Sequence, residues 1–256
     1  MYTMAIQLVV DVSWSENTAI SAGNGKVYTW TKTKFVESGS NITTETMTCG
    51  TMLPVLTLSP IAAALLGGSK TLPEIPDSAW DSSMQPKVMG TATRSGTMLT
   101  ANPGPVLVGM TLANAATAPW PAATQIMTAD HDGDGKPGVT AIPRQSGDFV
   151  APPTSIGGAA TDKIYVVSRV VATTSATVDG CPATQMGTAD VSKFDNHVVG
   201  CHVKGGSECN SDQTMFVDTN SPVFTPKAGT GKFTAKMISD TATCADVRAM
   251  LPAPAQ

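Results

Sequence analysis

A strict alternation of side chains near the N-terminus constrains the fold of this chain more than any other feature. Every even-numbered position from 4 to 14 carries a large apolar side chain, namely Met4, Ile6, Leu8, Val10, Val12 and Trp14. Successive residues of a β-strand point to opposite faces, so a period of two predicts a strand with one face against a core. Such a strand needs hydrogen-bonded neighbours, and the rest of the chain supplies candidates.

Segments rich in Val, Thr and aromatic residues recur along the chain, between turns that contain Gly, Asn or Pro. These residue types suit the pleated surface of a sheet. We expect further strands at residues 26–37, 42–49, 106–112, 139–142, 163–178, 187–194, 197–203 and 232–238. Gly23-Asn24-Gly25 and Asp195-Asn196 are interpreted as hairpin turns. The pattern predicts an all-β fold, either an antiparallel barrel or a two-sheet sandwich, of about ten strands.

The whole chain, residues 1–256, is predicted to form a single β-rich domain, because 256 residues with 41% hydrophobic side chains suit one substantial core. Five prolines between residues 54 and 86 disfavour long paired strands, so we expect an irregular Pro/Gly-rich insert at about residues 50–105. Two short helices are expected. One covers residues 60–66 with Ser59 as its N-cap, and the other covers residues 242–251, with its cap at residues 239–241.

Charge and hydropathy argue against two classes of partner. The net charge is −4 and no basic patch is present, so we do not expect binding to nucleic acid. No uninterrupted apolar run approaches the roughly 20 residues of a membrane-spanning helix, so no transmembrane segment is expected. Residues 1–4 lack the charged and apolar regions of a signal peptide. If the protein is exported, this is therefore its mature part; we expect a protein that is secreted or held at the outer cell envelope.

The five cysteines favour structural disulfides over thiol chemistry, because none forms the C-x-x-C pair of zinc or redox sites. A bridge between Cys209 and Cys244 would tie the C-terminal helix to the sheet. Cys181 with Cys201 would then be the second pair, and Cys49 would remain free. Five cysteines also allow other pairings, including one that uses Cys49.

The clearest motif is an acidic loop at residues 130–138, with the sequence D-H-D-G-D-G-K-P-G. Asp130, Asp132 and Asp134 stand at alternate positions and Gly135 follows, as in the first half of an EF-hand loop. Alternate side chains in a tight loop can turn toward one point, where calcium takes about six to eight oxygen ligands. We predict a Ca²⁺ site formed by these three carboxylates and the backbone carbonyl of Lys136.

The loop departs from an EF-hand at the final ligand, because Ala141 stands in place of the bidentate Glu and no long flanking helices are expected. It resembles instead the D-x-D-x-D-G loops of thrombospondin type 3 repeats, and dockerin-like or integrin-type calcium loops, which occur in extracellular proteins. This resemblance implies a structural Ca²⁺ that clamps the loop. The alternative is a solvated acidic turn without an ion. His131 is expected to face solvent and not to bind the metal.

Four tryptophans are candidates for ligand binding. They could line an apolar pocket if the sheet closes, or they could be core anchors: Trp14, Trp30, Trp80 and Trp120. His197 and His202 are expected on opposite faces of a strand, which makes them poor partners for one metal. The sequence holds neither a G-x-S-x-G nucleophile elbow nor an H-E-x-x-H helix, and no catalytic residue is assigned.

Several segments together resemble a family of uncharacterised, β-rich bacterial secreted proteins and predicted lipoproteins, over most of the chain. They are residues 25–30, 49–54, 130–140, 194–201 (F-D-N-H-V-V-G-C) and 244–248 (C-A-D-V-R). The family has no assigned activity. The resemblance therefore implies export and the calcium loop, and it adds no catalytic residue.

Three functions are consistent with these features. The first is a secreted, calcium-stabilised β-barrel that binds a small molecule or a glycan and is not an enzyme; this is the hypothesis we favour. The second is a self-associating subunit of the cell envelope or of an extracellular filament, suggested by the charge-poor, Thr/Ala/Gly-rich composition. The third is an extracellular hydrolase, which would need acid and base residues that converge in a cleft.

Overall fold

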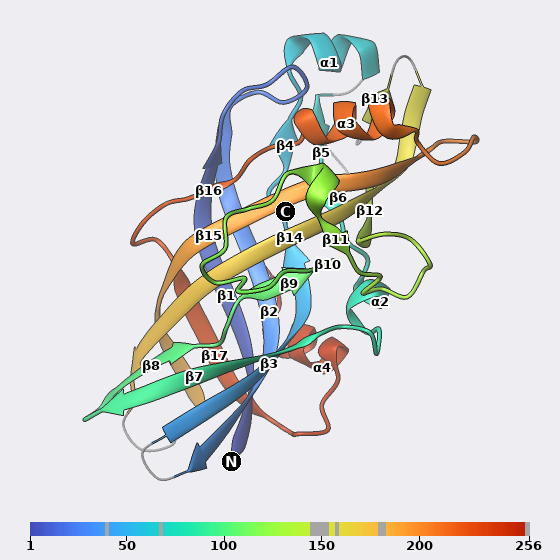
Figure 1. The fold of residues 1–256 in the computed structure, drawn as a ribbon. Helices are drawn as coiled ribbons and strands as arrows, with labels where there is room; N and C mark the ends of the chain where they lie inside the picture. The colour runs from blue at the N-terminus through green and yellow to red at the C-terminus, as the bar shows by residue number, and fades with distance from the viewer. Residues whose placement is uncertain (39–40, 67–68, 144–153, 157–158, 179–182, 254–256) are drawn as a thin grey trace.

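Eight antiparallel strands close into a barrel in the computed structural model, which describes residues 1–256 except 39–40, 67–68, 144–153, 157–158, 179–182 and 254–256 (Figure 1). The ring contains, in order, β1 (Tyr2–Trp14), β2 (Gly23–Ser38), β3 (Asn41–Met52), β7 (Lys87–Ser95), β8 (Met98–Asn102), β14 (Ala159–Thr177), β15 (Thr184–Val203) and β17 (Lys232–Ile238). Each strand pairs with the next one in this order, and β17 pairs with β1. The all-β prediction is confirmed, and the ring of pairings corresponds to the barrel alternative.

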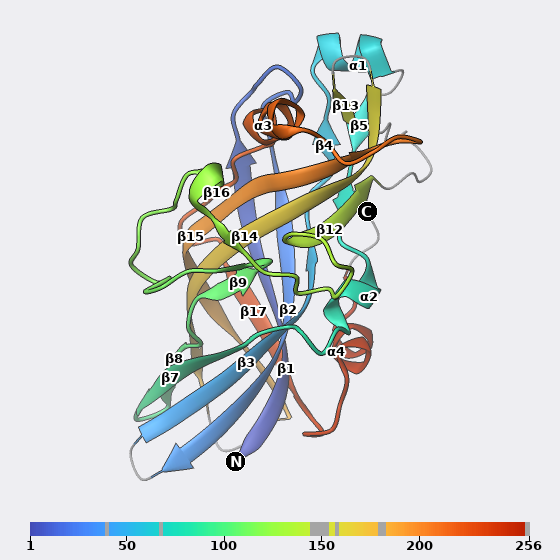
Figure 2. The same cartoon turned by 45° about the vertical axis from the view of Figure 1, so that its right-hand side comes forward.

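Met4, Val10, Val12 and Trp14 of β1 are buried in the barrel core and Ile6 packs against it, as the alternation predicted. Two buried clusters fill the interior. The upper core contains Val10, Val12, Trp14, Val27, Leu56, Val106, Val108, Val170, Phe194 and Phe224. The lower core, nearer the N-terminus in Figure 2, contains Met4, Phe35, Ile42, Leu99, Ala176 and Phe233. Several threonines of the strands are also buried. The Oγ1 atoms of Thr33 in β2 and Thr46 in β3 form a hydrogen bond of 3.0 Å between the two strands.

β14 extends beyond the ring and carries further strands along one edge. After β8, the same edge pairs with β9 (Val106–Val108), β12 (Val139–Pro143) and β13 (Thr154–Ile156). β12 pairs in turn with β6 (Pro73–Glu74). The remaining short strands are β4 (Leu56–Thr57), β5 (Lys70–Thr71), β10 (Met110–Thr111), β11 (Met127–Thr128) and β16 (Thr225–Pro226).

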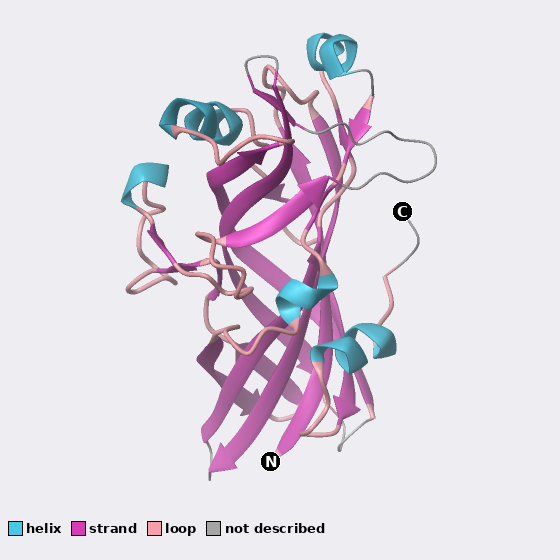
Figure 3. Ribbon diagram, turned by 90° about the vertical axis from the view of Figure 1, so that its right-hand side faces the viewer, coloured by secondary structure: helices cyan, strands magenta, loops and turns pink. Residues whose placement is uncertain are grey.

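Short helices lie around the strands (Figure 3). They are α1 (Pro60–Leu66), α2 (Asp77–Trp80), α3 (Ser211–Thr219), α4 (Cys244–Met250) and a 3-10 turn, η1 (Ala123–Gln125). The two helices predicted from sequence are present. Ser59 caps α1 as expected, because its Oγ accepts from the amide of Ala62. The cap of α4 is Thr243, which forms a capping box with Asp246, and not residues 239–241.

Two predicted turns are wrong. Asp195 and Asn196 lie inside the continuous strand β15, where they pair with Arg169 and Ser168 of β14. The Arg169 guanidinium binds the Asp195 carboxylate at 2.6 Å, so this side chain has a partner while the backbone stays extended. Gly23 and Gly25 begin β2, and a Cβ at Gly23 would lie 2.5 Å from the ring of Trp14. These glycines therefore make room for side chains and do not form the turn.

The range 50–105 is more regular than expected, since it contains β7 and β8 of the barrel wall. The inner face of β7 carries small residues: Gly90 lies opposite Thr44, and Ala92 opposite Ile42. A Cβ on Gly90 would come within 2.3 Å of the Asn102 carbonyl oxygen. A strand with so little apolar contrast between its faces gives a weak sequence pattern.

Two disulfides are present, and their pairing differs from the preferred prediction. Cys49 of β3 is bonded to Cys244 of α4, and Cys201 of β15 to Cys209. The first bridge does hold the C-terminal helix against the barrel, but through Cys49 in place of Cys209, because α4 packs on the outer face of β2 and β3 beside Trp30. Cys181, the fifth cysteine, lies outside the described residues.

None of the helices in the described part of the chain has the length and apolar character needed to cross a bilayer.

Loss of the Cys49–Cys244 bridge should cost more stability than loss of the Cys201–Cys209 bridge. The first closes a loop with a sequence separation of 195 residues and the second one of 8. The chain-entropy model gives about 5 kcal/mol for the long loop and about 2.5 kcal/mol for the short one. Urea unfolding of the Cys49→Ala/Cys244→Ala and Cys201→Ala/Cys209→Ala variants measures the difference. Equal losses would contradict this ranking.

Candidate metal site

The acidic loop connects β11 to β12 and lies beside α2 (Figure 1). Its shape is set by Asp130, whose carboxylate accepts hydrogen bonds from the amides of Gly133 (2.7 Å), Asp134 (3.2 Å) and Gly135 (2.9 Å). Gly135 has a φ of +80°, a conformation that side chains with a Cβ rarely adopt. The loop therefore wraps around one carboxylate before it enters β12.

The three predicted carboxylates converge. One oxygen from each of Asp130, Asp132 and Asp134 lies within 4.8 Å of the others, so this cluster could hold a metal ion. Two of them are fixed by Thr140 of β12, whose amide donates to Asp132 Oδ2 at 2.8 Å and whose hydroxyl donates to Asp134 Oδ2 at 2.5 Å. The spacing of the motif thus brings together the oxygens that it predicted.

Asp132 holds an oxygen with no partner among the described residues. Its Oδ1 is buried and accepts no hydrogen bond, although buried carboxylate oxygens normally do. Burial is the main cause that raises the pKa of Asp132, and the negative charge of Asp134 adds to it, against the opposing hydrogen bond from the amide of Thr140. A cation bound between the three carboxylates would satisfy this oxygen and offset the repulsion.

Asp130 has the opposite electrostatic environment. Burial acts to raise its pKa, but the amide hydrogen bonds from Gly135 and Gly133 outweigh burial and hold the pKa below its usual value. The pKa values of Asp130 and Asp132 therefore move in opposite directions. Asp132 is the more deeply buried of the two and burial dominates its shift, whereas Asp130 accepts hydrogen bonds from three backbone amides.

His131 is buried, which corrects the expectation that it faces solvent. Its Nδ1 accepts a hydrogen bond of 2.9 Å from the amide of Gly109, and burial lowers its pKa. Its backbone carbonyl accepts a 3.1 Å bond from Nε2 of Gln85, in the segment after α2. The residue between the first two acidic positions thus ties the loop to two distant segments.

The other end of the loop is tied to β14 and to the segment closed by Cys201–Cys209. Lys136 Nζ binds Glu208 at 2.6 Å, and the hydroxyl of Tyr165 donates to the same carboxylate at 2.9 Å. The hydrogen bond from Lys136, ahead of that from Tyr165, lowers the pKa of Glu208 against the opposing effect of burial. The Lys136 side chain is therefore occupied by Glu208, and the predicted role of its backbone carbonyl as a metal ligand stays a prediction.

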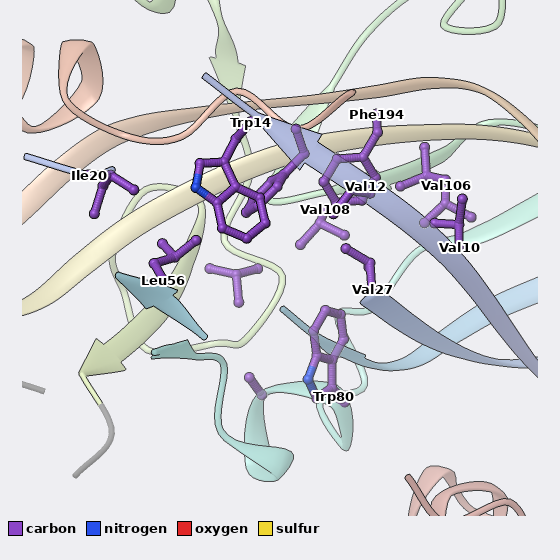
Figure 4. Close-up of a cluster of buried hydrophobic side chains, with 14 of the residues drawn as sticks. Val10, Val12, Trp14, Ile20, Val27, Leu56, Trp80, Val106, Val108 and Phe194 are labelled. Carbon is purple, nitrogen blue, oxygen red and sulfur yellow. The ribbon is translucent and has the colours of Figure 1, made fainter. Parts of the chain in front are cut away.

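The four tryptophans occupy different places. Trp14 lies in the upper core, and Trp30 packs under α4, where its Nε1 donates to the Leu251 carbonyl. Trp80 points from α2 toward Val27 and Val108 of the upper core (Figure 4). Trp120 lies outside the barrel, stacked on His197 with Arg169 5.2 Å from its ring centroid.

Two adjoining cavities lie at the upper core. The inner cavity, of about 90 Å³, is mainly apolar and lies between strands of the barrel; Trp80, Val108, Val170, Phe194, Asn196 and Phe224 are among its lining residues. The outer cavity, of about 110 Å³, is lined by Trp30, Trp80, Glu74, Asp77 and Arg248 among others. Trp14 and Trp120 line neither of these two. Of the four tryptophans, Trp30 and Trp80 both line the outer one of these two cavities.

Other candidate polar residues are engaged in contacts that hold the fold. His197 lies 2.9 Å from the Asp218 carboxylate, and His202 lies 2.7 Å from Asp162. Arg248 contacts the carboxylates of Asp77 and Asp81. Each of these contacts joins side chains from segments that are distant in the sequence.

Sequence reasoning missed the residues that support the loop. Thr140 follows the acidic loop by two positions, so its contact with Asp132 and Asp134 could have been anticipated from the turn at Gly138. Gln85 and Glu208 lie 46 and 72 residues from the loop residues they bind. They could not have been found, because no local pattern encodes contacts between segments so far apart in the sequence.

Gly138→Ala should destabilise the protein more than Gly135→Ala. Both glycines have a positive φ, at +84° and +80°, which costs about 1–2 kcal/mol for alanine. A Cβ on Gly138 would also lie 2.7 Å from the Val166 carbonyl oxygen of β14, whereas one on Gly135 would meet nothing within 4 Å. That clash should add about 1–3 kcal/mol. Urea unfolding in EDTA measures both losses, and an equal effect would mean that β14 does not limit this position.

Comparisons of the chain with protein-family models, with curated proteins and with solved structures find no match.

Proposed function

We propose that this chain is a secreted binding protein, not an enzyme, whose barrel is stabilised by a structural Ca²⁺ in the acidic loop and takes up a small molecule or a glycan. The observation that supports the metal most directly is the buried, unpartnered Oδ1 of Asp132 beside two further carboxylates. The two adjoining cavities at the upper core support ligand binding.

Calcium suits the donor set better than softer metals do. The three side chains offer only carboxylate oxygens, which hard cations prefer, while zinc sites use Cys and His. His131 is the nearest imidazole in sequence, and its Nδ1 is already occupied by the Gly109 amide. The carbonyl of Lys136 and water would supply the remaining oxygens of a calcium site.

A structural role follows from what the loop contacts. Gly109, Gln85, Thr140 and Glu208 all bind residues of the loop, and they come from four different segments of the chain. An ion that holds the loop in one shape would therefore hold these segments together. The small helices nearby are not the long flanking helices that a calcium-driven switch would move.

Extracellular calcium and structural disulfides belong to the same environment. Millimolar calcium is available outside cells, and disulfides persist there because the environment is oxidising. The two disulfides of the structure are compatible with that location. Barrels of eight strands are just wide enough to hold one small ligand, which agrees with a binding role.

Calcium should raise the melting temperature of the wild-type protein and leave that of Asp132→Ala unchanged. Extracellular calcium modules bind with dissociation constants of about 10⁻⁴–10⁻³ M. At 10 mM calcium such a site adds about 1.5–3 kcal/mol, equivalent to about 3–10 °C for a chain of this size. Differential scanning calorimetry in EDTA and in excess calcium measures the shift.

Asp190→Ala is the matched control, because Asp190 is an exposed carboxylate on β15 and lies outside the loop. This variant should retain the full calcium shift. Identical melting curves of the wild-type protein in EDTA and in calcium would refute the proposed calcium site. An equal shift in Asp132→Ala would place the ion elsewhere.

A further inference from the structure

One residue that lines the inner cavity carries a polar atom without a hydrogen-bond partner. Asn196 of β15 lines this cavity, and its Oδ1 is buried without a hydrogen-bond partner among the described residues. The Nδ2 atom of the same amide donates to the Pro222 carbonyl at 3.3 Å, which fixes which end of the amide is the oxygen. The free end is therefore an acceptor and calls for a donor.

Most of the cavity wall around this acceptor is apolar. Val106, Val108, Val170, Phe194 and Phe224 lie in it, and all five belong to the upper core. Five polar side chains also line the cavity, those of Thr29, Thr51, Ser168, Asn196 and Ser221. Of these, Asn196 carries the buried acceptor that has no partner among the described residues. A molecule with an apolar body and one donor therefore suits both parts of this wall.

The volume limits the size of that molecule. A group the size of a water molecule needs about 10–15 Å³ of cavity volume. The inner cavity, of about 90 Å³, therefore has room for about six to nine non-hydrogen atoms. Thr51, Leu53, Pro73, Ile75 and Trp80 line both the inner and the outer cavity. The two cavities therefore adjoin at this shared wall, and the outer one is also lined by Glu74, Asp77 and Arg248.

We propose that the inner cavity binds a small, mainly apolar alcohol or phenol, whose hydroxyl donates a hydrogen bond to Oδ1 of Asn196. This inference rests on the proposed binding function and specifies the ligand class and its place in the barrel. Ser168 of β14 lies directly opposite Asn196 in the strand pairing and also lines the cavity. The ligand's polar end therefore lies at the β14–β15 pair and its apolar end among the valines and phenylalanines.

Phenol and fluorobenzene test the proposal, because they have the same number of non-hydrogen atoms and only phenol carries a donor. NMR titration of the ¹⁵N-labelled, calcium-loaded full chain measures both dissociation constants. We expect phenol to bind about fivefold more tightly, as one hydrogen bond implies. In Asn196→Leu, which keeps the side-chain size, the preference should fall to about one.

Nuclear Overhauser effects in the wild-type chain test the position of the ligand without a variant. We expect them between the ring protons of phenol and the methyl groups of Val108 and Val170. Val108→Phe should fill the cavity and abolish binding of both probes. Equal affinities for the two probes in wild-type protein would overturn the role of Asn196. Contacts of phenol only with the outer cavity would overturn the site and leave a ligand-binding barrel in place.

Failure of both probes to bind would also overturn the inference. It would not bear on the calcium part of the proposed function, which the melting experiment decides independently. A protein that binds neither probe but gains stability with calcium would be a calcium-stabilised barrel with a different ligand class. A protein that binds phenol in the cavity but shows no calcium shift would retain the inference and lose the metal site.

Discussion

Backbone hydrogen bonding along both edges of β14 is the interaction on which the rest of the structure depends. One edge pairs with β15 over nearly its whole length, and the other pairs in turn with β8, β9, β12 and β13. The pairing with β8 and β15 closes the barrel. The pairing with β12 places the acidic loop, and the carbonyl of Val166 sets how closely Gly138 can approach.

The two faces of β14 carry side chains with different roles. Val170 faces the barrel and lines the inner cavity, whereas Arg169 lies on the outside, almost fully buried. The guanidinium of Arg169 is satisfied by Asp195 and by the carbonyls of Ala115 and Ala118. A buried charge is tolerated only when its donors are occupied in this way. Arg169 thereby fastens the segment before η1 to the outside of the barrel and keeps Asp195 in an extended strand.

The sequence predicted what depends on local periodicity and spacing. The alternation from Met4 to Trp14 predicted the inner face of β1, and the three alternating aspartates predicted which oxygens converge. It did not predict what depends on strand register. Cys49 meets Cys244 across 195 residues only because α4 packs on β2 and β3, and no local pattern encodes that contact. Strand β7 was missed because Gly90 and Ala92 leave its inner face almost without apolar bulk.

β12 contacts both the acidic loop and the inner cavity. Val139 and Ala141 are buried, Val139 in the upper core and Ala141 in the wall of the inner cavity. Thr140 between them turns to the opposite face and binds Asp132 and Asp134. Because alternate residues of one strand face opposite sides, an ion that orders the loop also orders this strand. Calcium held by the loop would thus contribute to a fixed cavity wall, and a preformed cavity is what a small ligand needs in order to bind without a large ordering cost.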